Sequence, residues 1–153
     1  MLNVRDIMTT SVITIKPETG IIEAAKILMD NHINGAPVID EDGYVVGILC
    51  RDDLISQQKS VPLPSFFVVL DGIIPLTSTK HIEKEMEKMS ATTVAHAMTQ
   101  KPVTVKPDTT IEEVATIMID RKVHTIPVLD DDAYLVGIVG KEDILKTIIP
   151  DSV

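Results

Sequence analysis

Two aspartates occupy the same place in two repeated segments of the chain, ninety positions apart. Asp53 follows the apolar run that ends at Leu49, and Asp143 follows the matching run that ends at Val139. A strand that turns into a helix at such a point presents free backbone N–H groups, where an anion such as phosphate is favoured. An ionised carboxylate there can accept hydrogen bonds from both hydroxyls of a ribose. The pair therefore indicates two nucleotide sites.

The same two aspartates have a second interpretation, in which each only stabilises the start of a helix. A hydroxyl residue followed three positions later by an acid forms a capping box. The capping position is Cys50 in one copy and Gly140 in the other, and neither brings a preferred side-chain oxygen. A purely capping role would leave both acids without a reciprocal partner, which favours ribose binding.

These positions belong to an internal repeat without insertions. Several short matches recur at the same spacing: Met8-Thr9 with Met98-Thr99, Lys16-Pro17 with Lys106-Pro107, Pro37-Val38 with Pro127-Val128, and Val46-Gly47-Ile48 with Val136-Gly137-Ile138. An intact register predicts two equivalent units, residues 1–55 and 94–153, which pack about a pseudo-twofold axis to form one globular pair. The cleft between the units is then the expected place for function.

Each unit is predicted to fold as β-α-β-β-α, which gives a mixed α/β chain of the α+β class. The first has a β-branched run at Val12–Ile15, a helix from about Gly20 to Asn31, a hairpin at Ala36–Ile39 and Tyr44–Leu49, and a helix opening at Asp52. The second has Val103–Val105, a helix from about Thr110 to Arg121, strands at Ile126–Leu129 and Tyr134–Val139, and a helix from Lys141. One buried helical stripe is expected from Ile21, Ala24, Ala25, Leu28 and Met29.

The segment 56–93 repeats nothing. It contains the apolar run Phe66–Leu70 and a charged, helical stretch from Lys80 to Met89. One interpretation is a packed linker with a connecting helix. The other is a segment that docks on a partner, because aromatic residues such as Phe66 and Phe67 concentrate in interface cores.

Composition narrows the classes of function. With 153 residues, 44% of them hydrophobic, the chain is long and apolar enough for a compact core. A net charge of −9 and an aromatic content of 3% disfavour nucleic acid as a partner, because such binding uses basic side chains and stacking platforms. The apolar runs fall far below the ~20 residues that span a bilayer, so we expect no membrane insertion.

Several kinds of site find no support in the sequence. The single cysteine, Cys50, excludes an intramolecular disulfide and offers no paired-thiol metal site, which fits a cytoplasmic protein. The acidic turns Asp40–Gly43 and Asp130–Asp132 are too short for a calcium loop. No nucleophile elbow or phosphate loop is present. We therefore expect no metal, no cofactor and no catalytic residues.

The ordered motifs resemble those of the cystathionine β-synthase (CBS) domain family. The motifs are Val4–Thr9, Thr14–Pro17, Ala36–Asp40 and Gly47–Leu54, and they return between Val94 and Leu145. The chain thus resembles a tandem pair, or Bateman module, without an attached catalytic or transport domain. The resemblance implies a regulatory module whose clefts bind AMP, ADP, ATP or S-adenosylmethionine and which signals to an enzyme or transporter.

The resemblance also implies a homodimer that forms through exposed helices, here near Ile21–Met29 and Ile111–Ile119. Burial within the monomer explains the apolar residues of these helices as well. The alternative function is a scaffold for dimerisation or interaction that binds no ligand.

In the family, one motif supplies the adenine contacts and the other supplies the ribose aspartate, so the copies cross over. One cleft would combine Thr10, Ser11, Val12, Ile33 and Asn34 with Ile138, Gly140 and Asp143. The other would combine Gln100, Lys101, Pro102, Val123 and His124 with Ile48, Cys50 and Asp53.

His124 matches a family position at which a basic side chain approaches phosphate, and its counterpart is the neutral Asn34. The resemblance therefore predicts the tighter phosphate contact in the cleft of His124 and Asp53. An ordinary, partly buried histidine is the alternative. Arg51, Lys101 and Lys141 are expected on the solvated surface.

Overall fold

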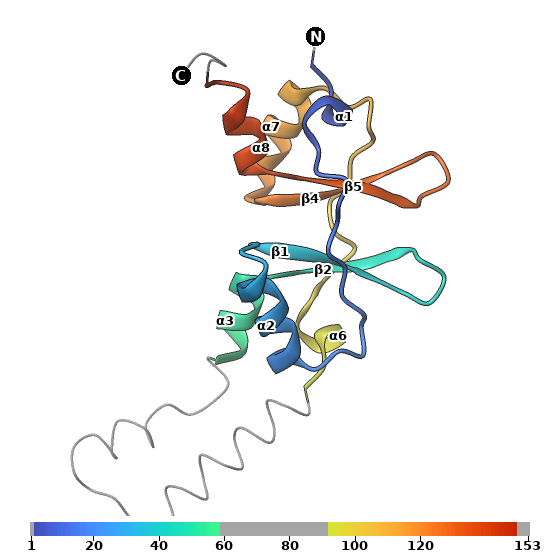
Figure 1. Cartoon of the computed structure of the whole chain (residues 1–153), viewed down its shortest axis with the longest axis vertical. Coiled ribbons are helices and arrows are strands. Elements are labelled where there is room, and N and C mark those ends of the chain that lie inside the picture. The colour runs from blue at the N-terminus through green and yellow to red at the C-terminus, as the bar shows by residue number, and fades with distance from the viewer. Residues whose placement is uncertain (1, 59–91, 150–153) are drawn as a thin grey trace, which may run out of the picture.

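The computed structural model of the chain describes residues 2–58 and 92–149 (Figure 1). The first half contains α1 (Val4–Ile7), α2 (Ile21–Asp30), β1 (Gly35–Ile39), β2 (Val45–Cys50) and α3 (Arg51–Gln58). The second contains α6 (Val94–Ala97), β3 (Thr99–Gln100), α7 (Ile111–Arg121), β4 (Thr125–Leu129), β5 (Leu135–Gly140) and α8 (Lys141–Lys146). The predicted helix at 80–89 and the apolar run 66–70 lie outside the described residues.

The predicted hairpin of each half is confirmed, with the same register in both. In β1 and β2, Pro37 pairs with Ile48, and in β4 and β5, Pro127 pairs with Ile138. The two hairpin turns have the same hydrogen bonds, because an aspartate after each first strand accepts hydrogen bonds from two later backbone N–H groups. Asp40 Oδ1 accepts from Asp42 and Tyr44, and Asp130 Oδ1 accepts from Asp132 and Tyr134.

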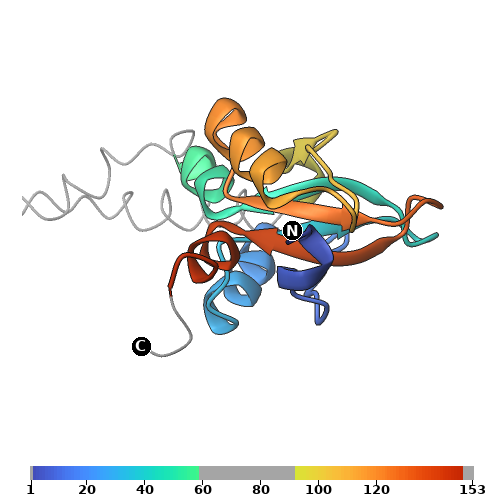
Figure 2. The ribbon, with the colours of Figure 1, turned by 90° about the horizontal axis from the view of Figure 1, so that it is seen from above.

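The two hairpins lie one over the other, and α2, α3, α7 and α8 flank them at one end (Figures 1 and 2). Seen from above, α2 and α8 lie on one side of the hairpins, whereas α3 and α7 lie on the other (Figure 2). In the repeat, α2 corresponds to α7 and α3 corresponds to α8. Each side therefore carries one helix of each kind, which is the pseudo-twofold relation that the repeat predicts. It places the start of α8 opposite the chain that leaves α2.

Each hydrophobic core contains the N-terminal segment of the other half. Val4 of α1 is fully buried in the second core with Val114 and Ile126, and Val94 of α6 is fully buried in the first core with Leu28. Backbone hydrogen bonds fix the exchange, since the Val4 N–H donates to the Thr109 carbonyl at 2.9 Å. The two halves are therefore tied together by their first turns.

Glycines let the exchanged segments pass close to the strands. A Cβ built on Gly47 of β2 would lie 2.5 Å from the sulfur of Met98, and one on Gly137 of β5 would lie 2.6 Å from the sulfur of Met8. The segments pair with the strands just there, because Thr9 bridges Ile138 and β3 pairs with β2.

The expected strand at Val12–Ile15 is reduced to one bridge, in which Ile15 pairs in parallel with Val38. Ile15 donates to the Pro37 carbonyl, and Ile39 donates to Ile15. The ladder ends on either side of this bridge because the next donors would be Pro37 and Pro17, and neither has an N–H. Val105 and Val128 repeat this single bridge in the second half.

The helices α2 and α7 confirm the predicted ranges, but the buried stripe of α2 is narrower than expected. Ile21, Ala24 and Leu28 are buried, whereas Met29 is 59% exposed. Its counterpart in α7, Ile119, is 77% exposed. Both residues therefore face away from the core of this chain.

Candidate ligand-binding cleft

A cavity of about 230 Å³ opens between the halves, where the chain after α1 and the chain after α2 face β5 and α8. Seven of the residues expected in the first cleft line it: Ser11, Val12, Ile33, Asn34, Ile138, Gly140 and Asp143. Both halves thus contribute to one pocket, hereafter the Asp143 cleft.

Thr10 lies elsewhere. It lines a different cavity, with Thr14 and Leu135, while its neighbours Thr9 and Ser11 line the Asp143 cleft. Successive side chains of an extended segment point to opposite faces, so Thr10 and its two neighbours face different cavities. Thr9 lines the Asp143 cleft, and its backbone bonds to Ile138 fix its position.

The carboxylate of Asp143 uses one oxygen to stabilise its helix. Its Oδ2 accepts a hydrogen bond from the Gly140 N–H at 2.8 Å, and Asp53 Oδ2 accepts likewise from the Cys50 N–H at 2.8 Å. Each aspartate therefore makes one of the two hydrogen bonds of a capping box. The other, from a backbone N–H of the helix to the side chain at position 50 or 140, is absent among the described residues. The other oxygen, Oδ1, accepts from Thr99 at 3.5 Å in Asp53. In the described part of the chain, Asp143 Oδ1 has no such partner, so it can accept from a ligand.

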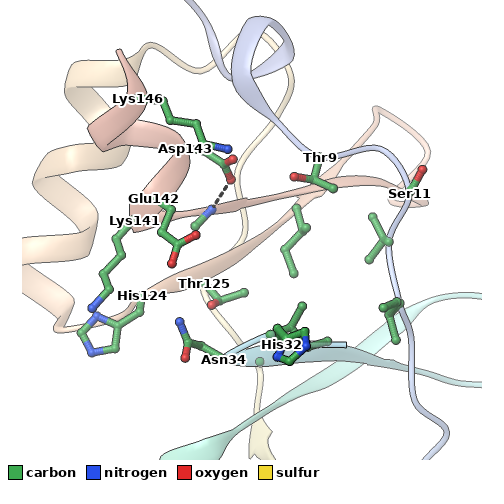
Figure 3. Close-up of a pocket in the computed structure, with 16 residues that line it drawn as sticks. Thr9, Ser11, His32, Asn34, His124, Thr125, Lys141, Glu142, Asp143 and Lys146 are labelled. Carbon is green, nitrogen blue, oxygen red and sulfur yellow. Dashed lines mark hydrogen bonds between the residues drawn. The ribbon is translucent and has the colours of Figure 1, made fainter. Parts of the chain in front are cut away.

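Cationic and polar side chains gather at one end of the cleft. Lys141 and His124 lie together there with Asn34 below them, whereas Thr9 and Ser11 lie at the opposite end (Figure 3). The backbone holds the pair together, because the Lys141 N–H donates to the His124 carbonyl at 3.1 Å. Lys141, expected only on the solvated surface, is indeed exposed but also lines the cleft.

His124, which was expected in the cleft of Asp53, lines the Asp143 cleft. The residue immediately precedes β4, as Asn34 precedes β1, and these two strands contact each other across the pseudo-twofold axis. Both residues therefore lie near the axis, where the assignment of a side chain to one cleft does not follow from the order of the motifs.

The structure brings together part of the second expected set. Gln100 pairs with Gly47 of β2, next to Ile48, and Thr99 reaches Asp53. Cys50 adjoins Asp53 through its backbone hydrogen bond. Of the other expected residues, Lys101 has a left-handed backbone with φ of 50°, Pro102 is half-buried, and Val123 packs against the second core.

Burial dominates the electrostatics around Asp53. Desolvation raises the pKa of the Asp53 carboxyl, hydrogen bonds from Cys50 and Thr99 oppose this shift, and the charge of Asp52 adds to it. Burial of the Cys50 thiol, followed by the charges of Asp53 and Asp52, raises its pKa to about 11. The thiolate is the reactive form of cysteine, so this thiol is poorly suited to nucleophilic or redox chemistry at neutral pH.

Several residues of the Asp143 cleft escaped the sequence analysis: Thr9, Ile13, His32, Gly35, Thr125, Glu142 and Lys146. Lys146 had a usable signal, since it follows Asp143 by three positions in α8, and residues at that spacing share a helix face. His32 has a left-handed backbone with φ of 54°, so its direction depends on a turn that the sequence pattern did not indicate.

Neither a metal-binding cluster nor a membrane-spanning helix occurs among the described residues. Among residues 2–58 and 92–149, no group of three or more His, Cys, Asp or Glu side chains is arranged to hold a metal ion. None of the helices described is long and apolar enough to cross a membrane.

One known family model matches each of the two halves of the chain. The model of the CBS domain matches residues 4–60 and again residues 94–150. The chain belongs to the CBS domain family. Its two halves are a tandem CBS pair, and the exchanged N-terminal turns and stacked hairpins are the arrangement of that pair.

Similar proteins match nearly the whole chain. The uncharacterized protein MJ1426 of Methanocaldococcus jannaschii is 30% identical over 155 residues, which is 95% of this chain and 90% of that protein. The crystal structure of CBSX2 from Arabidopsis thaliana in complex with AMP is 25% identical, with a TM-score of 0.72 over 97% of this chain and 96% of that one.

A further similar structure is the CBS domain pair of protein MJ0100 in complex with 5-methylthioadenosine and S-adenosyl-L-methionine. It is 28% identical, with a TM-score of 0.72 over 97% of this chain and 96% of that one. Two CBS pairs similar to this chain thus bind adenosyl compounds.

Proposed function

We propose that this CBS pair is a regulatory module that binds an adenosyl compound in the Asp143 cleft. The observation that carries the proposal is the position of Asp143. Its Oδ1 has no partner among the described residues, and it lies in a cavity to which both CBS motifs contribute. A ribose supplies the two adjacent hydroxyl donors that such an acceptor can use.

The rest of the cleft suits the other parts of such a ligand. The side chains of Val12, Ile33 and Ile138 give an apolar lining for a base, and Thr9 and Ser11 add hydroxyl groups beside it. An apolar pocket with a few polar groups is the usual form of a small-molecule site. AMP and methylthioadenosine, which the similar CBS pairs bind, share the adenosine part that this lining would hold.

A ligand in this cleft would couple the two motifs. Ser11 and Val12 come from the first motif, whereas Ile138 and Asp143 come from the second. A compound that contacts both favours the relative position of the motifs that fits it best, because a ligand shifts an equilibrium by its difference in affinity between states. The occupied state would then be recognised by an enzyme or transporter, with the module itself acting in the cytoplasm without catalysis.

A homodimer is the second part of the proposal. Four exposed apolar side chains lie at equivalent positions of the two motifs: Met29 with Ile119, and Ile55 with Leu145. They belong to α2, α3, α7 and α8, of which α2 and α7 are the helices expected to mediate dimerisation. Light scattering tests this part: we expect twice the chain mass, and a monomeric Met29→Glu/Ile119→Glu variant that stays folded. A wild-type monomer would contradict it.

Thermal unfolding in the presence of adenosine, methylthioadenosine, AMP, ADP, ATP and S-adenosylmethionine tests ligand binding. A compound at 100 times its dissociation constant stabilises the folded state by ~2.7 kcal/mol, or about 5–10 °C for a domain of this size. We expect at least one compound to reach this shift and Asp143→Ala to abolish it. If no compound moves the midpoint, the exposed apolar helices favour the alternative, a scaffold without ligand.

A further inference from the structure

A second cavity, of about 290 Å³, borders the chain segment that forms one wall of the Asp143 cleft. This segment, residues 10–14 and hereafter the strap, connects the two hairpins (Figure 1). Before the strap, Thr9 exchanges two backbone hydrogen bonds with Ile138 of β5. After it, Ile15 donates to the Pro37 carbonyl of β1 at 3.0 Å. Both ends of the strap are therefore fixed.

The strap divides its side chains between the two cavities. Ser11 and Ile13 line the Asp143 cleft. Thr10 and Thr14 line the second cavity, and Val12 borders both. This alternation is that of an extended chain, in which successive side chains point to opposite sides. The second cavity, hereafter the Thr10 cavity, is therefore separate from the Asp143 cleft, although the strap is common to both.

Two hydroxyl groups in the Thr10 cavity have no hydrogen-bond partner among the residues that the structure describes. They belong to Thr10 and Thr14. A threonine hydroxyl can donate one hydrogen bond and accept others. Residues four positions apart in an extended segment have Cα atoms at most about 13 Å apart, and here Val12 lies between them. The two hydroxyls can therefore bind polar groups at the two ends of one small molecule.

The strands give the Thr10 cavity an apolar wall that is only partly buried. Ile39 ends β1, Leu135 begins β5, and Val136 follows it. All three are half-buried and line the cavity. Ile39 and Leu135, like Val12, belong to neither of the hydrophobic cores of the described residues. A molecule in the cavity would remove this apolar surface from water, which favours binding.

The lining of the Thr10 cavity contains no charged side chain in the described part of the chain. Its remaining residue, Gly43, ends the turn 40–43, whose other three residues are acidic. These carboxylates would repel an anion in the cavity. An ammonium group would lose water without meeting a carboxylate in the lining, and burial of an unpaired charge is costly. The lining therefore favours an uncharged molecule.

We propose that the Thr10 cavity binds a small uncharged molecule with an apolar centre and a hydrogen-bonding group at each end. A cavity of about 150 Å³ is enough for benzene, so this one has room for a substituted ring. Thr10 and Thr14 bind the polar ends, and Val12, Ile39 and Leu135 contact the ring. Because the strap lines both cavities, the bound molecule also holds one wall of the Asp143 cleft in place. The site is independent of adenosyl binding.

Tyrosol, a phenol with a hydroxyethyl group opposite the phenolic hydroxyl, is the probe. Amide NMR signals of the ¹⁵N-labelled full chain report both its binding and the fold of each variant. We expect saturable shifts in the strap and at Leu135 and Val136. Tyramine and 4-hydroxyphenylacetate, which carry a charge on the same frame, should bind about ten-fold more weakly. Thr10→Val/Thr14→Val should weaken tyrosol roughly ten-fold, as expected for two hydrogen bonds.

Two control variants isolate the hydroxyl groups. Thr10→Ser/Thr14→Ser keeps both hydroxyls and should bind tyrosol more tightly than the valine variant. Thr104→Val removes the hydroxyl at the position equivalent to Thr14 in the second motif and should leave tyrosol binding unchanged. Equal tyrosol affinity in the valine variant and the wild type overturns the role of the two threonines.

The wild-type titrations test the site itself. Shifts that centre on Asn34 and Gly140 would place tyrosol in the Asp143 cleft and contradict the proposal. Binding of tyramine or 4-hydroxyphenylacetate as tight as that of tyrosol overturns the selection of an uncharged molecule. The absence of saturable tyrosol binding overturns the site, whatever the result with adenosyl compounds.

Discussion

The rings of Tyr44 and Tyr134 stack on each other with centroids 4.9 Å apart and planes inclined by 15°. They are equivalent residues of the two CBS motifs, their hydroxyl oxygens lie 3.4 Å apart, and their backbones form a bridge. The pair therefore joins the two hairpins on the pseudo-twofold axis. A change in the angle between the motifs would therefore alter the stacking of these two rings.

Replacing one ring should loosen this contact. We expect Tyr134→Ala to lower the midpoint of thermal unfolding, because the variant loses the stacked ring, whereas Tyr134→Phe keeps the ring and should lower it less. The hydrogen bond to Tyr134 is the largest cause that raises the pKa of Tyr44, so Tyr134→Phe should lower that pKa in an ultraviolet titration. A Tyr44 titration unaffected by the change would contradict the contact between the hydroxyls.

Because an exchanged segment passes close to Gly137, we expect a larger side chain at this position to destabilise the fold. A Cβ at Gly137 would approach the Met8 sulfur at 2.6 Å and the Thr9 carbonyl at 3.1 Å. The methionine can move, but the backbone carbonyl is fixed by its bond from Ile138. We expect Gly137→Ala to lower the free energy of unfolding by about 1–3 kcal/mol in urea. Gly140→Ala is the matched control, because its Cβ meets nothing closer than 3.6 Å.

The Cys50 thiol should react slowly in the folded chain. Because its pKa is raised to about 11, we expect little alkylation by iodoacetamide at pH 8 and a steep increase as the pH approaches 11. Unfolding in urea should make the thiol react at the rate of a free cysteine. Rapid alkylation of the native protein at pH 8 would show that the thiol is not buried as described.

The raised pKa of Asp53 predicts a pH-dependent effect of its substitution. A carboxyl whose pKa is higher in the folded than in the unfolded chain favours folding at low pH and loses this contribution as the pH rises through that folded pKa. An asparagine side chain does not titrate, so the stability of the Asp53→Asn variant relative to the wild type should increase from pH 3 to pH 7. Denaturant unfolding at several pH values measures the trend, and a decrease would mean that the hydrogen bonds outweigh burial.

The sequence predicted the elements whose pattern is local. The helices α2 and α7 and both hairpins follow from apolar spacing and from acidic turns, and the repeat register supplied the equivalence of Asp53 and Asp143. The exchange of Val4 and Val94 between cores was not predictable, because a four-residue helix carries no pattern that says which core buries it. The same limit applies to Met29, whose apolar side chain fits the helical spacing but lies outside the buried face.

The candidate site was predictable to the extent that it depends on the strands and the helix start. Ile138, Gly140 and Asp143 have positions fixed by β5 and α8. Thr9 and His124 do not, since the first depends on the phase of an irregular segment and the second on a contact between β1 and β4 across the axis. Three-dimensional packing decides such positions, and the order of the motifs alone leaves them open.

Equilibrium binding of AMP to the wild-type chain and to Asp143→Asn, measured by titration calorimetry, tests the central claim most directly. Asparagine keeps the size of the side chain but lacks the charge that strengthens hydrogen bonds from the ribose. We predict saturable binding to the wild type and affinity reduced by about 10- to 100-fold in the variant, as expected for loss of charged hydrogen bonds. Equal AMP binding by both proteins, or no binding by the wild type, would contradict the account.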